Sequence, residues 1–127
     1  MSTDTTTATV STHVLDTSLG RPAADVPVRL ATRPGPTAGW EQLGGSVTDA
    51  DGRCADLPAL PEGTAQVRLE FDTDTYFARE ADGPPAPHAV GGTFFPEVAI
   101  TFTVRPGEHH HVPLLLSPFG YSVYRGS

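Results

Sequence analysis

The chain is poor in the residues that mark several large classes of protein. Lysine is absent, so its eight basic residues are all arginine, and they form no basic run in a chain of net charge −7. A nucleic-acid-binding protein is therefore unexpected. The single cysteine, Cys54, excludes a disulfide within the chain but is compatible with an oxidising or a reducing compartment. No apolar run approaches the ~18 residues that a membrane span requires.

A secretory signal is also missing. Residues 1–8 are polar and rich in threonine, with no basic region followed by an apolar one. We therefore expect a flexible N-terminal extension over residues 1–8 and one domain over residues 9–127, a length typical of a single core. Because the chain also lacks a peroxisomal Ser-Lys-Leu ending, the cytoplasm is the expected compartment.

Glycine and proline, in contrast, are abundant, with thirteen of each. Together with 38% apolar residues, they favour many short strands joined by turns over disorder. Apolar and polar residues alternate in several segments; in one of them, polar side chains separate Val67, Leu69 and Phe71. Such alternation gives each strand one apolar face. The pattern therefore predicts an all-β antiparallel sandwich or barrel.

The same alternation predicts eight strands, and one further segment favours a helix. The helix is expected from Asp74 to Glu80 with Thr73 as its N-cap, whereas the prolines and glycines of residues 81–92 favour a loop. The strands are expected near residues 9–17, 26–33, 40–48, 53–57, 65–72, 97–105, 109–116 and 119–125.

The three consecutive histidines at positions 109–111 allow more than one interpretation. On a strand, His109 and His111 share a face while His110 points away. These two could bind zinc with His13 as a third ligand, because catalytic zinc sites use three protein ligands. Without a metal, histidine is the natural acid–base group near neutral pH, with an ordinary pKa of about 6.5. We favour the interpretation without metal or cofactor, in which His109 and His110 are solvated or support the site.

Several motifs resemble those of the 5-hydroxyisourate hydrolases, a transthyretin-like family. They are STHVLDTSLGRPA (11–23), TDADGRC (48–54), YFAR (76–79), FFPEV (94–98) and HHHVPLLLSPFGYSVYRGS (109–127). The motifs occur in the family's order and together span nearly the whole domain. The closing YRGS is the most specific of them.

The resemblance implies a transthyretin-like sandwich of two four-stranded sheets with one short helix. It also implies hydrolysis of 5-hydroxyisourate to 2-oxo-4-hydroxy-4-carboxy-5-ureidoimidazoline in urate and purine catabolism, without a cofactor. A homotetramer, built as a dimer of dimers, is implied as well. Its active sites would lie in the channels where the dimers meet.

By resemblance, the catalytic residues are His13, Arg53 and His111. The histidines supply the base that activates water, although the sequence leaves open which of them takes the proton. Arg53 clamps the flat ring and stabilises negative charge, because a guanidinium has fixed donors that match carbonyl and imide edges. Substrate binding is implied for Tyr124, Arg125 and Ser127.

Two other functions are compatible with this fold. A transthyretin-like carrier would bind an aromatic small molecule in the same channel, but it would need an apolar lining, whereas two histidines and an arginine are polar and reactive. A purely structural sandwich domain would leave the clustered polar residues without a role. The predicted function is therefore hydrolysis, with an oxidised purine as partner and with neither nucleic acid nor membrane involved.

Overall fold

The computed structural model describes residues 7–80 and 93–126 of the chain. Over these residues the chain forms nine strands and one helix. They are β1 (Thr9–Asp16), β2 (Arg21–Pro22), β3 (Pro27–Arg33), β4 (Glu41–Val47), β5 (Arg53–Cys54), β6 (Gln66–Phe71), α1 (Thr73–Glu80), β7 (Val98–Thr103), β8 (His109–Ser117) and β9 (Gly120–Val123). All eight predicted strands are present, and the two-residue β2 is additional.

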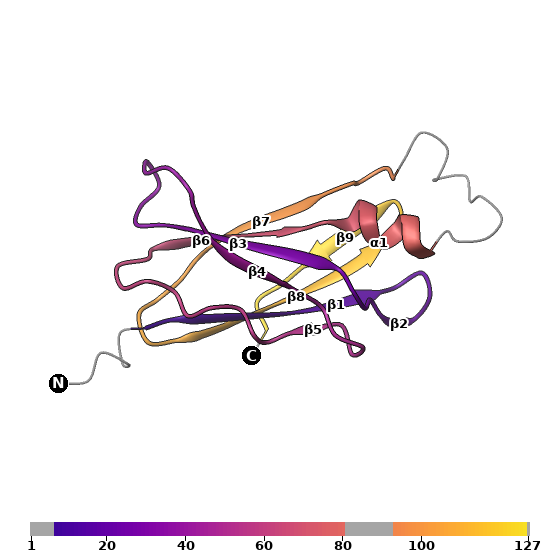
Figure 1. Ribbon diagram of the computed structural model, residues 1–127, viewed down its shortest axis with the longest axis horizontal. Coiled ribbons are helices and arrows are strands. Elements are labelled where there is room, and N and C mark those ends of the chain that lie inside the picture. The colour runs from indigo at the N-terminus through magenta and orange to yellow at the C-terminus, as the bar shows by residue number, and fades with distance from the viewer. Residues whose placement is uncertain (1–6, 81–92, 127) are drawn as a thin grey trace.

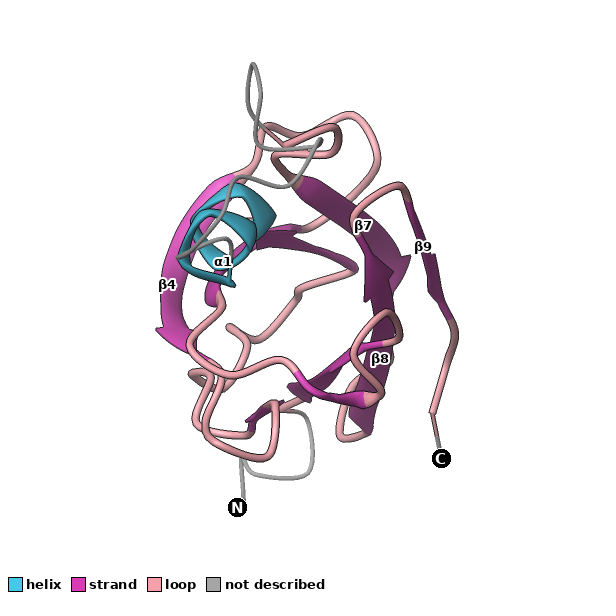
Figure 2. Cartoon of the chain, turned by 90° about the vertical axis from the view of Figure 1, so that its right-hand side faces the viewer, coloured by secondary structure: helices cyan, strands magenta, loops and turns pink. Residues whose placement is uncertain are grey.

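The strands form two sheets that face each other across the core. One sheet has the order β4-β3-β6-β7, and the other has the order β2-β1-β8-β9 with β5 also paired to β1. Figure 1 shows the long strands of both sheets running along the molecule, with α1 at one end. The view along that direction, in Figure 2, shows the strands surrounding the interior. The predicted transthyretin-like sandwich is confirmed, although one sheet carries a fifth, short strand.

The pairing of β1 with β8 departs from the antiparallel arrangement predicted from the alternation. Residues 9–16 run parallel to residues 109–116. A parallel pair needs a long crossover, and here the whole segment between the two strands supplies it. The other edge of β1 is divided between β2 and β5, which both pair with it antiparallel. This arrangement brings the first motif of the sequence beside the last.

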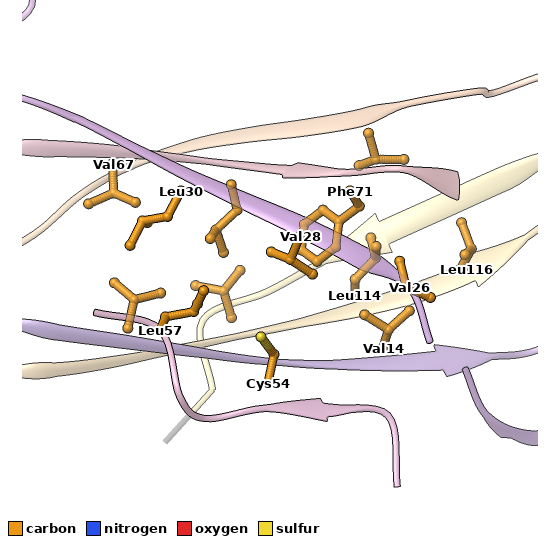
Figure 3. Close-up of a cluster of buried hydrophobic side chains, with 14 of the residues drawn as sticks. Val14, Val26, Val28, Leu30, Cys54, Leu57, Val67, Phe71, Leu114 and Leu116 are labelled. Carbon is orange, nitrogen blue, oxygen red and sulfur yellow. The ribbon is translucent and has the colours of Figure 1, made fainter. Parts of the chain in front are cut away.

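Alternating apolar residues fill the space between the sheets. In β6, Val67, Leu69 and Phe71 are fully buried and the residues between them are partly exposed, as predicted. Figure 3 shows Val14 and Leu114 of one sheet directed into the space that Phe71 of the other sheet also occupies. The two apolar faces thus form a single core.

Cys54 belongs to this core, as its interpretation as a small packing residue predicts. Its side chain is buried, and Figure 3 shows it directed into the interior. Burial raises the pKa of the Cys54 thiol, which keeps the sulfur protonated and poorly nucleophilic near neutral pH.

The helix begins one residue earlier than predicted, and its N-cap is a different residue. Asp72 accepts hydrogen bonds from the backbone N–H of Thr75 at 3.1 Å and from the Thr75 hydroxyl at 2.6 Å. The prediction that Thr73 caps the helix is wrong, because the buried Thr73 hydroxyl donates to the carbonyl of Phe95 instead. An aspartate caps a helix as well as a threonine does, so Asp72 can serve as the cap while the Thr73 hydroxyl makes a tertiary hydrogen bond.

Among the described residues, no helix has the length and apolar character needed to cross a membrane.

The packed structure already includes the last residues of the predicted extension. Ala8 is buried, and its carbonyl accepts a hydrogen bond from the backbone N–H of Leu60 at 3.0 Å. Residues 1–6 lie outside the described residues, as does the loop predicted over residues 81–92.

A buried carboxylate at the end of β1 joins the strand to the helix. One oxygen of Asp16 accepts from the backbone and the hydroxyl of Ser18, at 3.0 and 2.6 Å, and from the backbone of Leu19 at 3.1 Å. The other oxygen accepts from the hydroxyl of the buried Tyr76 at 2.6 Å. The YFAR motif is thereby fixed to the VLDTS motif, which orients the end of β1.

Replacing Tyr76 by phenylalanine should lower the free energy of unfolding by about 1.5–3 kcal/mol, because it leaves one oxygen of the buried Asp16 carboxylate without its donor. Urea unfolding of the two proteins measures the difference. Tyr124→Phe is the matched control, since Tyr124 is 56% exposed, and its stability should stay close to that of the original protein. Equal stability of all three proteins would contradict this role of the Tyr76 hydroxyl.

Candidate active site

Side chains from β1, β5 and β8 meet on the outer face of the five-stranded sheet. Even-numbered residues of β1 and β8 point into the core, so the odd-numbered residues point outward. In this register His111 lies opposite Ser11, and Arg53 lies opposite His13. The three residues proposed for catalysis are thus on one face, although they are far apart along the chain.

An open depression of about 330 Å³ hollows this face. Its volume is at the lower end of the range for small-molecule pockets. The lining residues are Ser11, Thr12, Arg53, Ala55, His109 and His111. Arg53 and His111 therefore share one hollow, while His13 is outside the set that lines it.

A tight turn sets the position of Arg53. The Asp49 carboxylate accepts hydrogen bonds from the backbone N–H groups of Asp51 and Arg53 at 2.9 and 3.0 Å. Gly52 completes the turn with φ of 75°, and its carbonyl accepts from the N–H of Val14 on β1 at 2.7 Å. Among the described residues, no ion pair or hydrogen bond occupies the exposed Arg53 guanidinium. Its five donors are available to a ligand in the depression.

The imidazole of His111 is held through a serine. The Ser11 hydroxyl oxygen lies 2.8 Å from Nδ1 of His111 and 2.8 Å from Nε2 of His109. The Nδ1 atom of His109 in turn lies 2.7 Å from the hydroxyl oxygen of Thr9. Because Nδ1 of His111 is engaged in this way, Nε2 is the nitrogen that remains for a ligand.

The surroundings of His111 favour its neutral form. Burial lowers the pKa of the imidazole below its ordinary value, and the nearby charges of Arg53, His13 and His109 lower it further. A neutral imidazole has the free lone pair that a general base requires. His111 therefore has the protonation state of a base at neutral pH.

The pKa of His111, followed through its ring protons by NMR, should lie below the ordinary value of 6.5. If its neutral form drives turnover, activity persists below pH 6.5 and is lost only as pH falls through the lowered pKa. Arg53→Gln removes one of the charges that lower this pKa, so the titration should move upward in that variant. A titration of His111 above 6.5 in the original protein would contradict the effect of burial.

His13 is tied to the turn that carries Arg53. Its Nε2 atom lies 2.9 Å from the carbonyl oxygen of Asp51. A carbonyl only accepts hydrogen bonds, so Nε2 carries the proton and the lone pair is on Nδ1. His13 and the turn of β5 are therefore linked by a side-chain bond as well as by the pairing of β1 with β5.

The three consecutive histidines separate as the strand period predicts. His109 is exposed on the outer face with His111, whereas His110 is only 4% exposed and points inward. The prediction that His110 is solvated is wrong, because the core side of β8 buries it, while a supporting role stays a prediction. Its Nε2 accepts from the backbone N–H of Arg105 at 3.2 Å, and its Nδ1 donates to the carbonyl of Thr9 at 3.4 Å.

Of the residues expected to bind substrate near the C-terminus, Tyr124 and Arg125 lie away from the depression. Tyr124 and Arg125 line a separate hollow of about 270 Å³ between β7 and β8. Arg125 pairs with Glu108 at 3.3 Å, and both side chains are largely exposed. Ser127 lies outside the described residues. The substrate-binding roles of these three residues stay predictions.

Gly126, in contrast, lies directly beside His111, whose imidazole lines the depression. Its N–H donates to the carbonyl of His111 at 2.7 Å, which joins the last described residue to β8. A Cβ atom on Gly126 would lie 2.7 Å from Cδ2 of the His111 ring and 3.3 Å from Cδ of Pro113. Glycine is therefore required here for a close approach and not for its backbone angles.

Gly126→Ala should reduce kcat about tenfold, because the added methyl group displaces the His111 ring from the geometry that Ser11 holds. The substitution should cost little stability, since the ring can shift while the strands stay paired. Gly120→Ala is the control on β9, because the nearest atom to its new Cβ is 3.8 Å away. Equal turnover in both variants would show that the contact does not position His111.

The positions of Ser11 and Gly126 beside His111 could not be found from the sequence. Ser11 is two residues before His13, so alternation puts the two on one face. What places it against His111 is the parallel register of β1 and β8, which no local pattern specifies. Gly126 belongs to the recognised YRGS motif, but its contact depends on the same tertiary pairing.

The described residues contain no group of three or more His, Cys, Asp and Glu side chains placed to hold a metal ion. The zinc interpretation required His13 to join His109 and His111. In the structure the Nε2 of His13 is bound to Asp51, while Ser11 lies between the other two histidines. The expectation of a reaction without a metal stays a prediction.

Comparison with known proteins identifies the family. Residues 10–126 match the profile of the HIUase/Transthyretin family, so the chain belongs to that family. It is 40% identical to the 5-hydroxyisourate hydrolase of Salmonella dublin over 93% of this chain and 80% of that protein. It is also 42% identical to the uric acid degradation bifunctional protein TTL of Arabidopsis thaliana, over 93% of this chain but only 37% of that longer protein.

Solved structures show that the fold alone does not separate the family's members. The 5-hydroxyisourate hydrolase of Klebsiella pneumoniae is similar with a TM-score of 0.72 and 37% identity, covering 94% of each chain. Transthyretin of Sparus aurata is similar with a TM-score of 0.74 and 29% identity, covering 92% of this chain and 95% of that one. The side chains of the depression must therefore carry the functional argument.

Proposed function

We propose that this chain hydrolyses 5-hydroxyisourate in urate degradation. The observation that carries the proposal is that Arg53 and His111, from distant parts of the chain, line one depression. Two relatives, 40% and 37% identical to this chain, match it over most of their own length and are named 5-hydroxyisourate hydrolase. A lining that contains an arginine and two histidines suits a polar oxidised purine better than an apolar hormone.

The reaction needs a base for water and a stabiliser for the oxyanion that forms when water attacks a ring carbonyl. Nε2 of His111 takes the proton from water, since its lowered pKa keeps the ring neutral. The Arg53 guanidinium donates to the ring oxygens and stabilises the negative charge that develops there. The adjacent C–N bond then opens, and the leaving nitrogen receives the proton that His111 took from water.

The remaining predicted residues are assigned supporting roles. His13 acts at the margin of the depression through Nδ1, because its Nε2–H is donated to Asp51. Tyr124, Arg125 and Ser127 are proposed to bind the substrate. For Tyr124 and Arg125, which line a different hollow of the same chain, this role requires a neighbouring subunit to complete the channel.

The test is to follow the ultraviolet absorbance of freshly prepared 5-hydroxyisourate with and without the protein. We expect the protein to accelerate the loss of the substrate's absorbance band. A titration with thyroxine serves as the comparison, because a carrier would bind it tightly. Tight thyroxine binding together with no acceleration would replace the hydrolase proposal by the carrier.

We also propose a homotetramer, built as a dimer of dimers, in the cytoplasm. The edge strand β9 and its turn expose Phe119 and Tyr121, at 64% and 42%, and an apolar strand edge is suited to pairing with a second copy. Light scattering should give the mass of four chains. A fully active monomer at micromolar concentration would contradict a site shared between subunits.

A further inference from the structure

A row of four polar side chains runs across the outer face of β1 and β8. Thr9, His109, Ser11 and His111 are joined by three contacts of 2.7, 2.8 and 2.8 Å. The row ends at His111 on one side and at Thr9 on the other, and Ser11, His109 and His111 all line the depression. Ser11, with 9% exposure, is the link between the two imidazoles.

The proton count of this row restricts the two histidines. A serine hydroxyl has one hydrogen, so it can donate to only one of the two imidazole nitrogens that contact it. The other nitrogen must carry a hydrogen and donate to the serine oxygen. When both rings are neutral, the nitrogens that face Ser11 are therefore in opposite states, and the tautomer of His111 is coupled to that of His109.

Only one of the two arrangements leaves His111 able to act as a base. If Ser11 donates to Nδ1 of His111, the proton of that ring is on Nε2 and its lone pair, on Nδ1, is occupied by Ser11. If Nδ1–H of His111 donates to Ser11, Nε2 has a free lone pair, and Ser11 donates to Nε2 of His109. The Nδ1–H of His109 then donates to Thr9.

We propose that Ser11 is a positioning residue that holds His111 as its Nδ1–H tautomer, and that His109 accepts the proton that His111 takes up. This proposal deepens the proposed function and rests on it for its catalytic consequence. One proton enters His111 at Nε2. The Nδ1 proton passes to the oxygen of Ser11, and the hydroxyl proton of Ser11 passes to Nε2 of His109. Both His111 and Ser11 end neutral, and the positive charge is on His109.

The charges around the row favour this direction of transfer. His111 faces the guanidinium of Arg53 on β5 and the imidazole of His13 on β1, besides His109 on its own strand. A positive charge on the half-buried His111 is repelled by Arg53 and poorly solvated. On the exposed His109 the same charge is in contact with water. The transfer also leaves every hydrogen bond of the row in place: donor and acceptor exchange in the two bonds of Ser11, and Nδ1–H of His109 still donates to Thr9.

The first experiment reads the tautomers without substrate. Long-range proton–nitrogen NMR spectra of 15N-labelled protein, recorded at a pH where all histidines are neutral, distinguish Nδ1–H from Nε2–H at each ring. We expect Nδ1–H at His111 in the original protein and in Ser11→Thr, which keeps the hydroxyl. In Ser11→Ala we expect His111 to gain Nε2–H. An Nε2–H tautomer of His111 in the original protein, or no change in Ser11→Ala, would overturn the proposal.

The second experiment measures turnover. Ser11→Ala should lower kcat about tenfold with little change in KM, as expected for losing one hydrogen bond at the reacting group. Ser11→Thr should restore most of the rate. Ser122→Ala, on the outer face of β9, removes a hydroxyl from the same sheet and should leave both kcat and the tautomers unchanged. A kcat for Ser11→Ala equal to that of the control would overturn the role of Ser11.

The role of His109 is tested by a double-mutant cycle with Ser11. His109→Phe should lower kcat to the level of Ser11→Ala, and the double variant should lose no more than either single variant. Additive losses, or an unchanged kcat in His109→Phe, would overturn His109 as the proton acceptor. Failure of the proposed function can be told apart from failure of this proposal. If the protein shows the coupled tautomers but does not hydrolyse 5-hydroxyisourate, the hydrogen-bonded row is present and only the reaction assigned to it is wrong.

Discussion

Alanine in place of Arg53 or His111 is expected to lower kcat/KM for 5-hydroxyisourate by roughly 10²-fold or more, the usual scale for an oxyanion donor or an acid–base group. The two side chains line the same depression, and each is proposed to supply a step that the other cannot. Arg53 contributes fixed charge and paired donors, whereas His111 contributes a lone pair. The loss should appear mainly in kcat, because both groups act on charge that develops as water attacks.

Arg105→Ala is the matched control for Arg53, since it removes an exposed arginine from the same chain, and Arg105 takes part in the described hydrogen bonds through its backbone. It should leave kcat/KM unchanged. Arg53→Lys keeps the charge but loses the planar pair of donors, so an intermediate rate is expected. If turnover survives in both Arg53→Ala and His111→Ala, the depression is not the site of the reaction.

Gly52→Ala should lower the free energy of unfolding by about 3 kcal/mol and abolish most of the activity of the folded protein. Gly52 has a φ of 75°, and a Cβ atom there would lie 2.3 Å from the carbonyl oxygen of Val14. That oxygen belongs to β1 and accepts from the N–H of Ala23 at 2.9 Å, so it is not free to move away. The turn must shift, and Arg53 follows it directly along the chain.

Gly63→Ala separates the cost of the backbone conformation at Gly52 from the cost of the steric contact with β1. Gly63 has a φ of 89°, but no atom lies within 4 Å of its missing Cβ, so alanine there meets only the cost of the backbone conformation, about 1 kcal/mol. Urea unfolding of both variants measures the steric part by difference. Activity should be preserved in Gly63→Ala. Equal destabilisation of the two variants would show that the contact with β1 does not hold the turn.

Much of the fold could be predicted because alternation is a local property. The burial of Val67, Leu69 and Phe71 follows from their spacing, and the ends of the long strands fall within two residues of the predicted positions. The parallel direction of β1 and β8 could not be predicted, since no turn joins them. The two-residue β2 could not be predicted either, because its pairing is imposed by the end of β1.

The residues of the candidate site also divide into those that a local pattern or motif predicts and those that depend on the folded chain. Residue type and period place His109 and His111 on one face, and the resemblance to known motifs selects His13 and Arg53. The contact of Ser11 with two imidazoles requires the register between strands about one hundred residues apart, which only the folded chain defines. The N-cap at Asp72 was missed because Thr73 is equally suited by type and differs only in its contact with Phe95.

The pairing of the first long strand with the penultimate one has a consequence for biosynthesis. On the ribosome, residues 9–16 emerge early but cannot acquire their parallel partner until residues 109–116 have been made. Until then one flank of the nascent strand is uncovered, and the imidazole of the proposed base does not yet exist. Chains with such distant contacts fold in about milliseconds to seconds. The catalytic depression is thus assembled at the end of synthesis, and shielding of that flank by a chaperone would favour the yield of active protein.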